Sequence, residues 1–558
     1  MNARRLRIPA LLAAACLWLC GCVKAPAPDN TAAPQPAAVT ASPADKPVLV
    51  GDIPCAFPLV SQPERISVLA SRHGDTEYDD VYVWQQYARM TGVEVDWTTI
   101  TIDQRGEAIN AALMNKTAVD LILRCKVSAR RLTQYGESGL ILDLNKDGLL
   151  ARCAPNCWHY LQTHPDTLAS VTNPDGTIYA LPQVNAGAEL RVSRKLFINR
   201  DWLRRVDLPL PTTTEELYQL LRAFQEQDAN GNGDSGDEIP LCSRDWLSIQ
   251  ESLSGAFGLM NRGAHNPVVD CDEASGAVRL TAATEGYRDF LDYCRRLYTE
   301  GLMDPNTFTM TDQEWTDNAL NDRIGVCFST NLASFPASTA DKWVGIDEAL
   351  EGPRGHKLWT AIRANFHSTG NAILPATCRD PALVLRWLDY FWTDEGTLFY
   401  HLGVEGETYA RQPDGSYDYL PKIYEEMARD NLTFDDAVSR YTPYPGGGNP
   451  TVEIAPYFMG GEMAPEPAET ARALFAYGPA EYWPSFTFTA EESELLSKLS
   501  SDLTKYIDAS AMDFITGRTP LSQWDAYLAQ LTQLRSAELT AVYQAALDRY
   551  RALLNSQS

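Results

Sequence analysis

Segments with alternating apolar and polar positions recur along the chain from residue 65 onward, separated by segments with helical spacing of apolar residues. In "RISVLAS" (65–71) and "VEVDWTT" (93–99) every second residue is apolar. This places Val93, Val95 and Trp97 on one face and predicts half-buried strands. The continuous apolar runs in "VDLILR" (119–124) and "RIGVCFS" (323–329) are typical of strands buried on both faces.

The sequence predicts two helices together with the residues at which they begin. Thr213 and Glu216 have the spacing of a capping box before one helix, and Thr489 and Glu492 have it before another. Their apolar stripes are Leu217, Leu220, Leu221 and Phe224 in the first helix and Leu496, Leu499 and Leu503 in the second. Because such helices alternate with the strands, the pattern predicts an α/β fold with largely parallel sheets.

The composition adds size and charge to this picture. The 558 residues, 45% hydrophobic and 10% aromatic, suffice for two or more lobes with cores and exclude disorder as the main state. The 73 Asp and Glu outnumber the 47 Lys and Arg. Such a surface repels nucleic acid and anionic lipid headgroups, so neither is an expected partner. The common nucleotide-binding and hydrolase motifs do not occur in the sequence.

The first residues have the layout of an export signal. Arginines at positions 4, 5 and 7 precede an apolar run that is too short to span a bilayer. The run ends in Leu19-Cys20-Gly21-Cys22, which resembles a bacterial lipobox whose lipidated residue would be Cys22. We therefore expect a signal peptide at 1–21 and a membrane-anchored protein facing outside the cytoplasm. The alternative is an ordinary cleaved signal with incidental cysteines.

The segment that follows cannot build a core. Residues 23–48 are rich in proline and alanine and predict an extended tether, which we place at 22–62. Among the cysteines that follow the signal peptide, Cys153 and Cys157 are the one closely spaced pair and could form a local disulfide.

An acidic stretch, "QEQDANGNGDSGDEIP" (225–240), combines alternating oxygen-bearing residues with glycines. Calcium prefers six or seven oxygens from a tight loop of this kind. The predicted ligands are Asp228, Asn230, Asn232, Asp234, Asp237 and Glu238. The twelfth position is Ile239 instead of Glu, so the stretch is a variant and not an EF-hand, and either Asp237 or Glu238 could close the coordination shell. The alternative is a polar turn after the helix at 213–227.

Five segments together resemble the family 1 extracellular solute-binding proteins of ABC importers. They occur in the order of that family and are "GTIYALP" (176–182), "LFINRDWLRRVDLPLPTTTEELYQLLRAFQEQDANGNGDSGDEIPL" (196–241), "RDFLDYCRRLYTEGLMDPNTFT" (288–309), "HLGVEGETYARQPDGSY" (401–417) and "DFITGRTPLSQWDAYLAQL" (513–531). Related members carry a similar calcium loop after the same helix, ending in "DEIP", which implies a structural Ca2+ in this chain.

The resemblance implies two α/β lobes that are discontinuous in sequence and joined by a hinge, with the maltose-binding-protein fold. The first lobe would comprise 63–186 and 366–440 and the second 187–365, with a C-terminal helical part at 441–558 packing mainly on the second lobe. Ligand would be captured as the lobes close. The implied ligand is a sugar or oligosaccharide, delivered to an ABC permease by a monomeric protein that is not an enzyme.

Sugars present flat CH faces and many hydroxyl groups, so aromatic rings beside charged groups suit them. The candidate ligand-binding residues are Arg72, Asp75, Trp246, Trp359, Tyr409 and Tyr444. Two other functions remain open on the sequence. One is an exported, calcium-containing carbohydrate-active enzyme, and the other is the same fold with a peptide or another polar solute as ligand.

Overall fold

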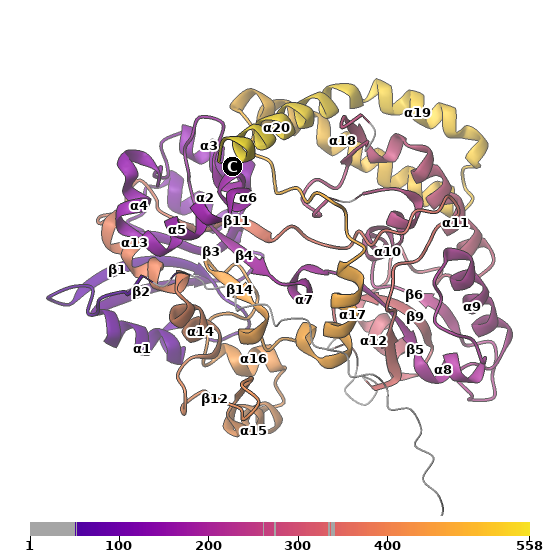
Figure 1. Ribbon diagram of the computed structural model, residues 1–558, viewed down its shortest axis with the longest axis horizontal. Helices are drawn as coiled ribbons and strands as arrows, with labels where there is room; N and C mark the ends of the chain where they lie inside the picture. The colour runs from indigo at the N-terminus through magenta and orange to yellow at the C-terminus, as the bar shows by residue number, and fades with distance from the viewer. Residues whose placement is uncertain are drawn as a thin grey trace, which may run out of the picture. The chain divides into compact units, whose positions relative to one another are not determined.

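The protein is described from a computed structural model (Figure 1). The described residues are 51, 53–260, 262–272, 275–332, 335 and 341–557. The predicted signal peptide, Cys22 and the tether up to residue 50 lie outside them. No helix within the described ranges combines the length and the apolar character that crossing a bilayer demands.

Six strands form the sheet of the first lobe in the order β14-β4-β11-β3-β1-β2. Their bounds are β1 Glu64–Ser71, β2 Val93–Ile100, β3 Leu121–Val127, β4 Leu181–Ala186, β11 Phe366–Ile373 and β14 Val452–Ile454. Strand β1 is parallel to β2 and β3, but β11 is antiparallel to both β3 and β4. The prediction of largely parallel sheets is therefore wrong, because β4 leads out of this sheet and β11 brings the chain back into it.

Four strands form the sheet of the second lobe in the order β10-β5-β9-β6. Their bounds are β5 Lys195–Asn199, β6 Ile239–Cys242, β9 Ile324–Ser329 and β10 Trp343–Gly345. Only β6 and β9 are parallel, while β5 is antiparallel to β9 and β10. Two hairpins complete the strands, β7 Val269–Cys271 with β8 Val278–Leu280 and β12 Tyr409–Arg411 with β13 Tyr417–Tyr419.

Helices that pack on the sheets or on one another complete the two lobes (Figure 1). Those of the first lobe are α1 Tyr82–Thr91, α2 Arg105–Met114, α3 Ala129–Glu137, α4 Leu149–Cys153, α5 Pro155–Thr163, α6 Pro165–Val171, α13 Pro381–Asp389, α14 Asp394–Leu402, α15 Pro421–Asp430 and α16 Phe434–Ser439. Those of the second lobe are α8 Arg200–Arg205, α9 Thr214–Glu226, α10 Trp246–Leu253, α11 Glu285–Thr299, α12 Asp312–Leu320, α17 Pro465–Phe475, α18 Ala490–Ile515, α19 Trp524–Gln533 and α20 Ser536–Gln557.

The two predicted helix starts are present with different cap geometry. At α18 the box is complete, because the Thr489 and Glu492 side chains each accept from the other residue's backbone N–H. At α9 the Thr213 hydroxyl accepts from Glu216 N, but the Glu216 carboxylate accepts from the backbone and hydroxyl of Thr212. The predicted stripes of both helices are buried.

Two segments that carry the chain between the lobes are paired with each other. We call 187–194, which includes α7 Ala188–Arg191, and 361–365 the crossing segments. Ser193 N donates to Ala361 O at 2.8 Å and Arg363 N to Arg191 O at 2.8 Å, and Val192 forms an antiparallel bridge with Ile362. These contacts hold the two segments side by side where the chain passes between the two sheets.

The C-terminal part serves both lobes. Strand β14 lies within the range 441–558 that the sequence assigns to helices, and it pairs in parallel with β4 in the first sheet. From α17 onward the apolar side chains join the core of the second lobe. Helix α20 contacts α6 of the first lobe as well as α18 and β8 of the second.

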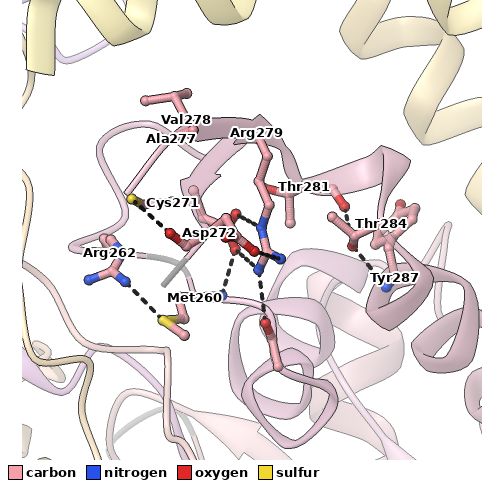
Figure 2. Close-up of polar contacts among 12 residues, drawn as sticks. Met260, Arg262, Cys271, Asp272, Ala277, Val278, Arg279, Thr281, Thr284 and Tyr287 are labelled. Atoms are coloured by element: carbon pink, nitrogen blue, oxygen red, sulfur yellow. Dashed lines mark hydrogen bonds and ion pairs between the residues drawn. The ribbon is translucent and has the colours of Figure 1, made fainter. Parts of the chain in front are cut away.

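Beside the β7–β8 hairpin, one buried ion pair is fully satisfied (Figure 2). Arg279 donates from Nε and Nη2 to the two carboxylate oxygens of Asp270 at 2.6 and 3.1 Å, and Met260 N donates to the same carboxylate. Since each charge has a partner, this cluster is structural. The nine described cysteines form no disulfide with one another, and the local bond considered between Cys153 and Cys157 is absent.

Candidate functional site

A polar junction forms where the first sheet meets the loop that follows α16. We call residues 444–449, "YPGGGN", the junction loop. Arg124 in β3 is 2% exposed and donates to the hydroxyl of Tyr78 and to the carbonyls of Pro445 and Gly447. The guanidinium therefore holds the loop against the strand through neutral acceptors.

Glycine is required in the junction loop by close backbone approach. Gly448 has φ +83°, and a Cβ atom there would lie 2.9 Å from Arg124 O. Gln183 Oε1 accepts from Gly448 N at 2.6 Å, and Asn449 Nδ2 donates to Glu453 Oε1 at 2.6 Å. Burial raises the pKa of Glu453 to about 7. The loop is thus fixed to β3, β4 and β14 at once.

Three of the predicted ligand-binding residues lie around this junction. Arg72 follows β1 and forms ion pairs with Asp75 at 3.6 Å and Glu77 at 3.3 Å. The neighbouring His73 lies against the junction loop, because a Cβ atom on Gly446 would be 3.0 Å from its own Cβ. The Asp75 side chain is fully exposed, whereas Tyr444 is 3% exposed with a buried hydroxyl that has no partner in the described part of the chain.

The other three predicted ligand-binding residues lie elsewhere and point into cores. Trp359 is 1% exposed and donates from Nε1 to Arg194 O at 2.9 Å. Trp246 stacks on Phe290 with the ring centroids 5.6 Å apart, and Tyr409 is buried in the first-lobe core. Trp359 and Tyr409 are buried, whereas Trp246 is half-buried, and the binding role of all three stays a prediction.

The sequence did not single out the cations around the junction. Lys126 in β3 donates from Nζ to Gly446 O at 3.1 Å, and Arg105 in α2 donates from Nε to Ser71 Oγ at 2.8 Å. On the crossing segments, Arg194 donates to the hydroxyls of Ser248 and Thr330. The available signal was the pair of charges at the end of the apolar run "LILRCKV" (121–127).

The acidic loop, residues 228–238, joins α9 to β6. Asp228 accepts from the backbone N–H groups of Asn232 and Gly233 at 3.0 and 2.9 Å, and Asn232 Oδ1 accepts from Asp234 N. Gly231 and Gly233 take the left-handed backbone conformation, with φ +75° and +91°. The side chains and backbone therefore fold the loop inward on itself.

The two acidic residues at the end of this loop differ in their hydrogen bonding. Asp237 accepts from the side-chain amides of Asn230 and Asn232 at 2.9 and 3.0 Å. Both carboxylate oxygens of Glu238 are buried and make no hydrogen bond of normal geometry among the described residues, although the backbone N–H groups of Glu238 and Asn230 lie near enough to favour the charged form in part. Burial, and then repulsion from Asp237 and Asp228, raises the pKa of Glu238.

An unsatisfied buried carboxylate beside two other carboxylates fits a divalent cation. Among the described residues no three His, Cys, Asp or Glu side chains converge as a metal site would need. A calcium shell in this loop would also use the amide oxygens of Asn230 and Asn232, which are not among those four residue types. The donor set, oxygen only, suits calcium better than zinc.

Comparison with known proteins confirms the resemblance found in the sequence. The chain is 24% identical over 492 residues to the "Fructooligosaccharide ABC transporter substrate-binding protein FusA" of Streptococcus pneumoniae, covering 85% of this chain and 88% of that protein. It is 27% identical over 241 residues to "Lipoprotein LipO" of Bacillus subtilis, covering 41% of this chain and 46% of LipO. No protein-family model matches the chain.

Solved structures show the same two-lobed fold. An HMO-binding, ABC-transporter-associated solute-binding protein from Bifidobacterium longum infantis has a TM-score of 0.74 at 22% identity, covering 88% of this chain and 99% of that one. An "EF-hand mutant" of Streptococcus pneumoniae FusA in complex with fructo-nystose has a TM-score of 0.69 at 21% identity, with the same coverage. These relatives are binding proteins of transporters and not enzymes.

Proposed function

We propose that this chain, a homologue of ABC-transporter substrate-binding proteins, is the extracellular receptor of an importer and captures an oligosaccharide between its two lobes. The observation that carries the proposal is the similarity to FusA along 85% of the chain, with the same two-lobed fold in solved relatives. FusA is named for fructooligosaccharide transport and the Bifidobacterium protein for HMO binding, which supports a saccharide ligand for this chain.

The crossing segments give the proposal its mechanism. Because they pair with each other beside the junction loop, bending there would move one lobe against the other with each core intact. Ligand that contacts both lobes favours the closed state, and its affinity depends on the free open–closed equilibrium. The strand order of the two sheets supports lobes that exchange the chain near residues 186 and 366.

We also propose that the mature chain is anchored by lipid at Cys22 and passes its ligand to a permease. The charged start and lipobox of the sequence, together with a relative named a lipoprotein, support the anchor. The expected location is the outer face of the cytoplasmic membrane, and the expected state is a monomer. The ATP hydrolysis that drives import belongs to another subunit, since the sequence has no P-loop.

We propose a structural Ca2+ in the acidic loop, closed by Glu238. The two unpartnered oxygens of Glu238 support a bidentate role, whereas Asp237 already accepts from two amides. The relative whose solved form is named an EF-hand mutant adds support for a metal loop of this kind. When bound, the ion would supply positive charge to a loop that holds four carboxylates, Asp228, Asp234, Asp237 and Glu238.

A thermal-shift screen of the chain from residue 23 onward tests the receptor function. The probes are neutral and acidic oligosaccharides, each recovered afterward and analysed by mass spectrometry. Ligand at about a hundred times its dissociation constant adds about 2.7 kcal/mol to the free energy of unfolding. A rise in melting temperature with the sugar recovered intact supports a receptor. Recovery of cleaved sugar would instead support a carbohydrate-active enzyme, and a response to peptides alone would support a peptide receptor.

A further inference from the structure

Five cations form a continuous group at the junction. We call Arg105, Arg124, Lys126, Arg194 and Arg363 the cation group. Lys126 interacts electrostatically with Arg105, Arg124 and Arg363, and Arg363 in turn with Arg194. The group therefore runs from α2 and β3 of the first lobe to both crossing segments.

None of the five has a carboxylate within ion-pair distance in the described part of the chain. Arg105, Arg124, Lys126 and Arg194 donate to hydroxyls and backbone carbonyls. The Arg363 guanidinium has neither a hydrogen bond nor an ion pair to any described residue, although its backbone is held at both N and O by Arg191. In contrast, the guanidinium of Arg279 is matched by both oxygens of Asp270 (Figure 2).

This lack of partners has an electrostatic cost. Burial lowers the pKa of Lys126 to about 8, and repulsion from Arg105, Arg124 and Arg363 adds to the effect. Burial also lowers the pKa values of Arg105 and Arg363. Positive charges that are crowded and partly desolvated destabilise the ligand-free protein unless something neutralises them.

Two acidic groups act electrostatically on members of the cation group. Glu453 acts on Lys126 and Arg124, and Glu251 acts on Arg363. Burial raises the pKa of Glu453 to about 7, which reduces the negative charge that it offers the group. The chain has 73 acidic residues against 47 basic ones, so carboxylates are abundant, yet none in the described ranges lies within ion-pair distance of this group.

From these contacts we infer that the ligand is an acidic oligosaccharide, whose carboxylate or sulfate groups are bound by the cation group when the lobes close. This inference rests on the proposed receptor function. Arg363 and Lys126 are the ligand-contacting residues. The Arg363 guanidinium has no partner among the described residues, and Lys126 donates one hydrogen bond, to Gly446 O. Arg124 positions the junction loop and is already committed to three carbonyls and one hydroxyl.

The test uses matched probes and matched variants of the chain from residue 23 onward. The probes are uronate oligosaccharides and their carboxyl-reduced counterparts, and sulfated oligosaccharides and their desulfated counterparts, titrated by calorimetry. The variants are Arg363→Gln and Lys126→Gln. The control is Arg295→Gln, which removes the same charge from α11, where no ion pair of Arg295 is found among the described residues.

We expect an acidic probe to bind at least about ten-fold more tightly than its neutral counterpart, since hydrogen bonds to charged groups carry about 1.5–3 kcal/mol. Arg363→Gln should weaken that binding about ten- to a hundred-fold, with Lys126→Gln acting in the same direction and Arg295→Gln leaving it unchanged. Melting temperatures of the ligand-free variants should equal or exceed that of the wild type, because an unpaired charge is removed.

Other outcomes separate this inference from the receptor function. Equal affinity for a charged probe and its neutral counterpart would overturn the inference and leave a sugar receptor. Selective binding of the charged probe that is insensitive to both Arg363→Gln and Lys126→Gln would overturn the assignment of these residues. Absence of binding by every saccharide would overturn both proposals. The uronate and sulfate arms identify which anionic group is bound.

Discussion

Replacing Glu238 by Gln tests the acidic loop with two effects of opposite sign. Without calcium, Glu238 is a carboxylate with both oxygens buried and unpartnered beside Asp228 and Asp237. Its folded pKa is raised, so the stability it contributes is present at low pH and is lost as pH rises through that folded value. Glu238→Gln removes this loss, and in calcium-free buffer at neutral pH the variant should be more stable than the wild type.

The magnitudes follow from burial and linkage. A buried polar group without a partner costs about 1–3 kcal/mol, which sets the expected gain in calcium-free buffer. Calcium at about a hundred times its dissociation constant should add about 2.7 kcal/mol to the wild type and little to the variant. A unit of about 500 residues has an unfolding entropy of about 1 kcal/mol/K, so these energies correspond to shifts of about 1–3 °C.

The assay is calorimetric melting of both proteins in EDTA and in calcium, with Glu107→Gln as control. Glu107 lies exposed on α2, far along the chain from the acidic loop, and loses the same charge. A wild-type melting temperature that is indifferent to calcium would show that the loop is only a turn. If Glu238→Gln kept the full calcium response, Asp237 would be the closing ligand and the reasoning from unpartnered oxygens would be refuted.

Three further perturbations test the core and the junction. Burial lowers the pKa of His401 to about 4, so its contribution to stability, about 3 kcal/mol, is present above pH 6.5 and lost as pH falls toward 4. The free energy of unfolding of the wild type minus that of His401→Asn, measured with denaturant, should therefore shrink over that pH range. A difference that stays constant would contradict this expectation. Gly448→Ala should lower the free energy of unfolding by about 1–3 kcal/mol more than the control Gly176→Ala. Gly176 has a similar φ of +86° but no atom within 4 Å of the added carbon. Equal losses of stability in urea unfolding would rule out a clash with Arg124 O. Arg124→Met should lower the free energy of unfolding by at least about 2 kcal/mol, because it leaves carbonyls of the junction loop unpaired, whereas Arg295→Met should be nearly neutral in the same melts.

Local signals in the sequence predicted local structure well. The stripe of α9 and the complete cap of α18 depend on residues three or four positions apart, and both are present in the structure. The partner of Glu216 could not be predicted, because Thr212 and Thr213 offer competing donors one residue apart. The choice between them depends on the entry path of the chain, which also pairs Thr213 with Glu351.

Long-range features escaped the sequence for a different reason. The apolar runs of β3 and β9 identify strands but carry no information on the direction of their partners, which is set by where the chain crosses between the lobes. Likewise, Trp359 and Trp246 have side chains suited to stacking on a sugar, but only packing reveals that one donates to Arg194 O and the other stacks on Phe290. Only Arg124 and Lys126 of the cation group are close in the sequence, so the proximity of the other members could not be predicted.

In a receptor that closes on its ligand, the acidic loop would make one lobe rigid and the cation group would control when the lobes close. A cation between α9 and β6 would tie the helix end to the strand and make the second lobe a more rigid body. The paired crossing segments then become the place where bending is least costly. Arg194 and Arg363 lie on those segments, and Lys126 and Arg105 lie on the first lobe. If the proposed closing shortens the distances between them, their mutual repulsion would oppose closing in the absence of ligand. An anionic ligand bound between these cations would make the electrostatic free energy of closing favourable. The charge arrangement would then keep the empty receptor open and allow it to close when the ligand binds.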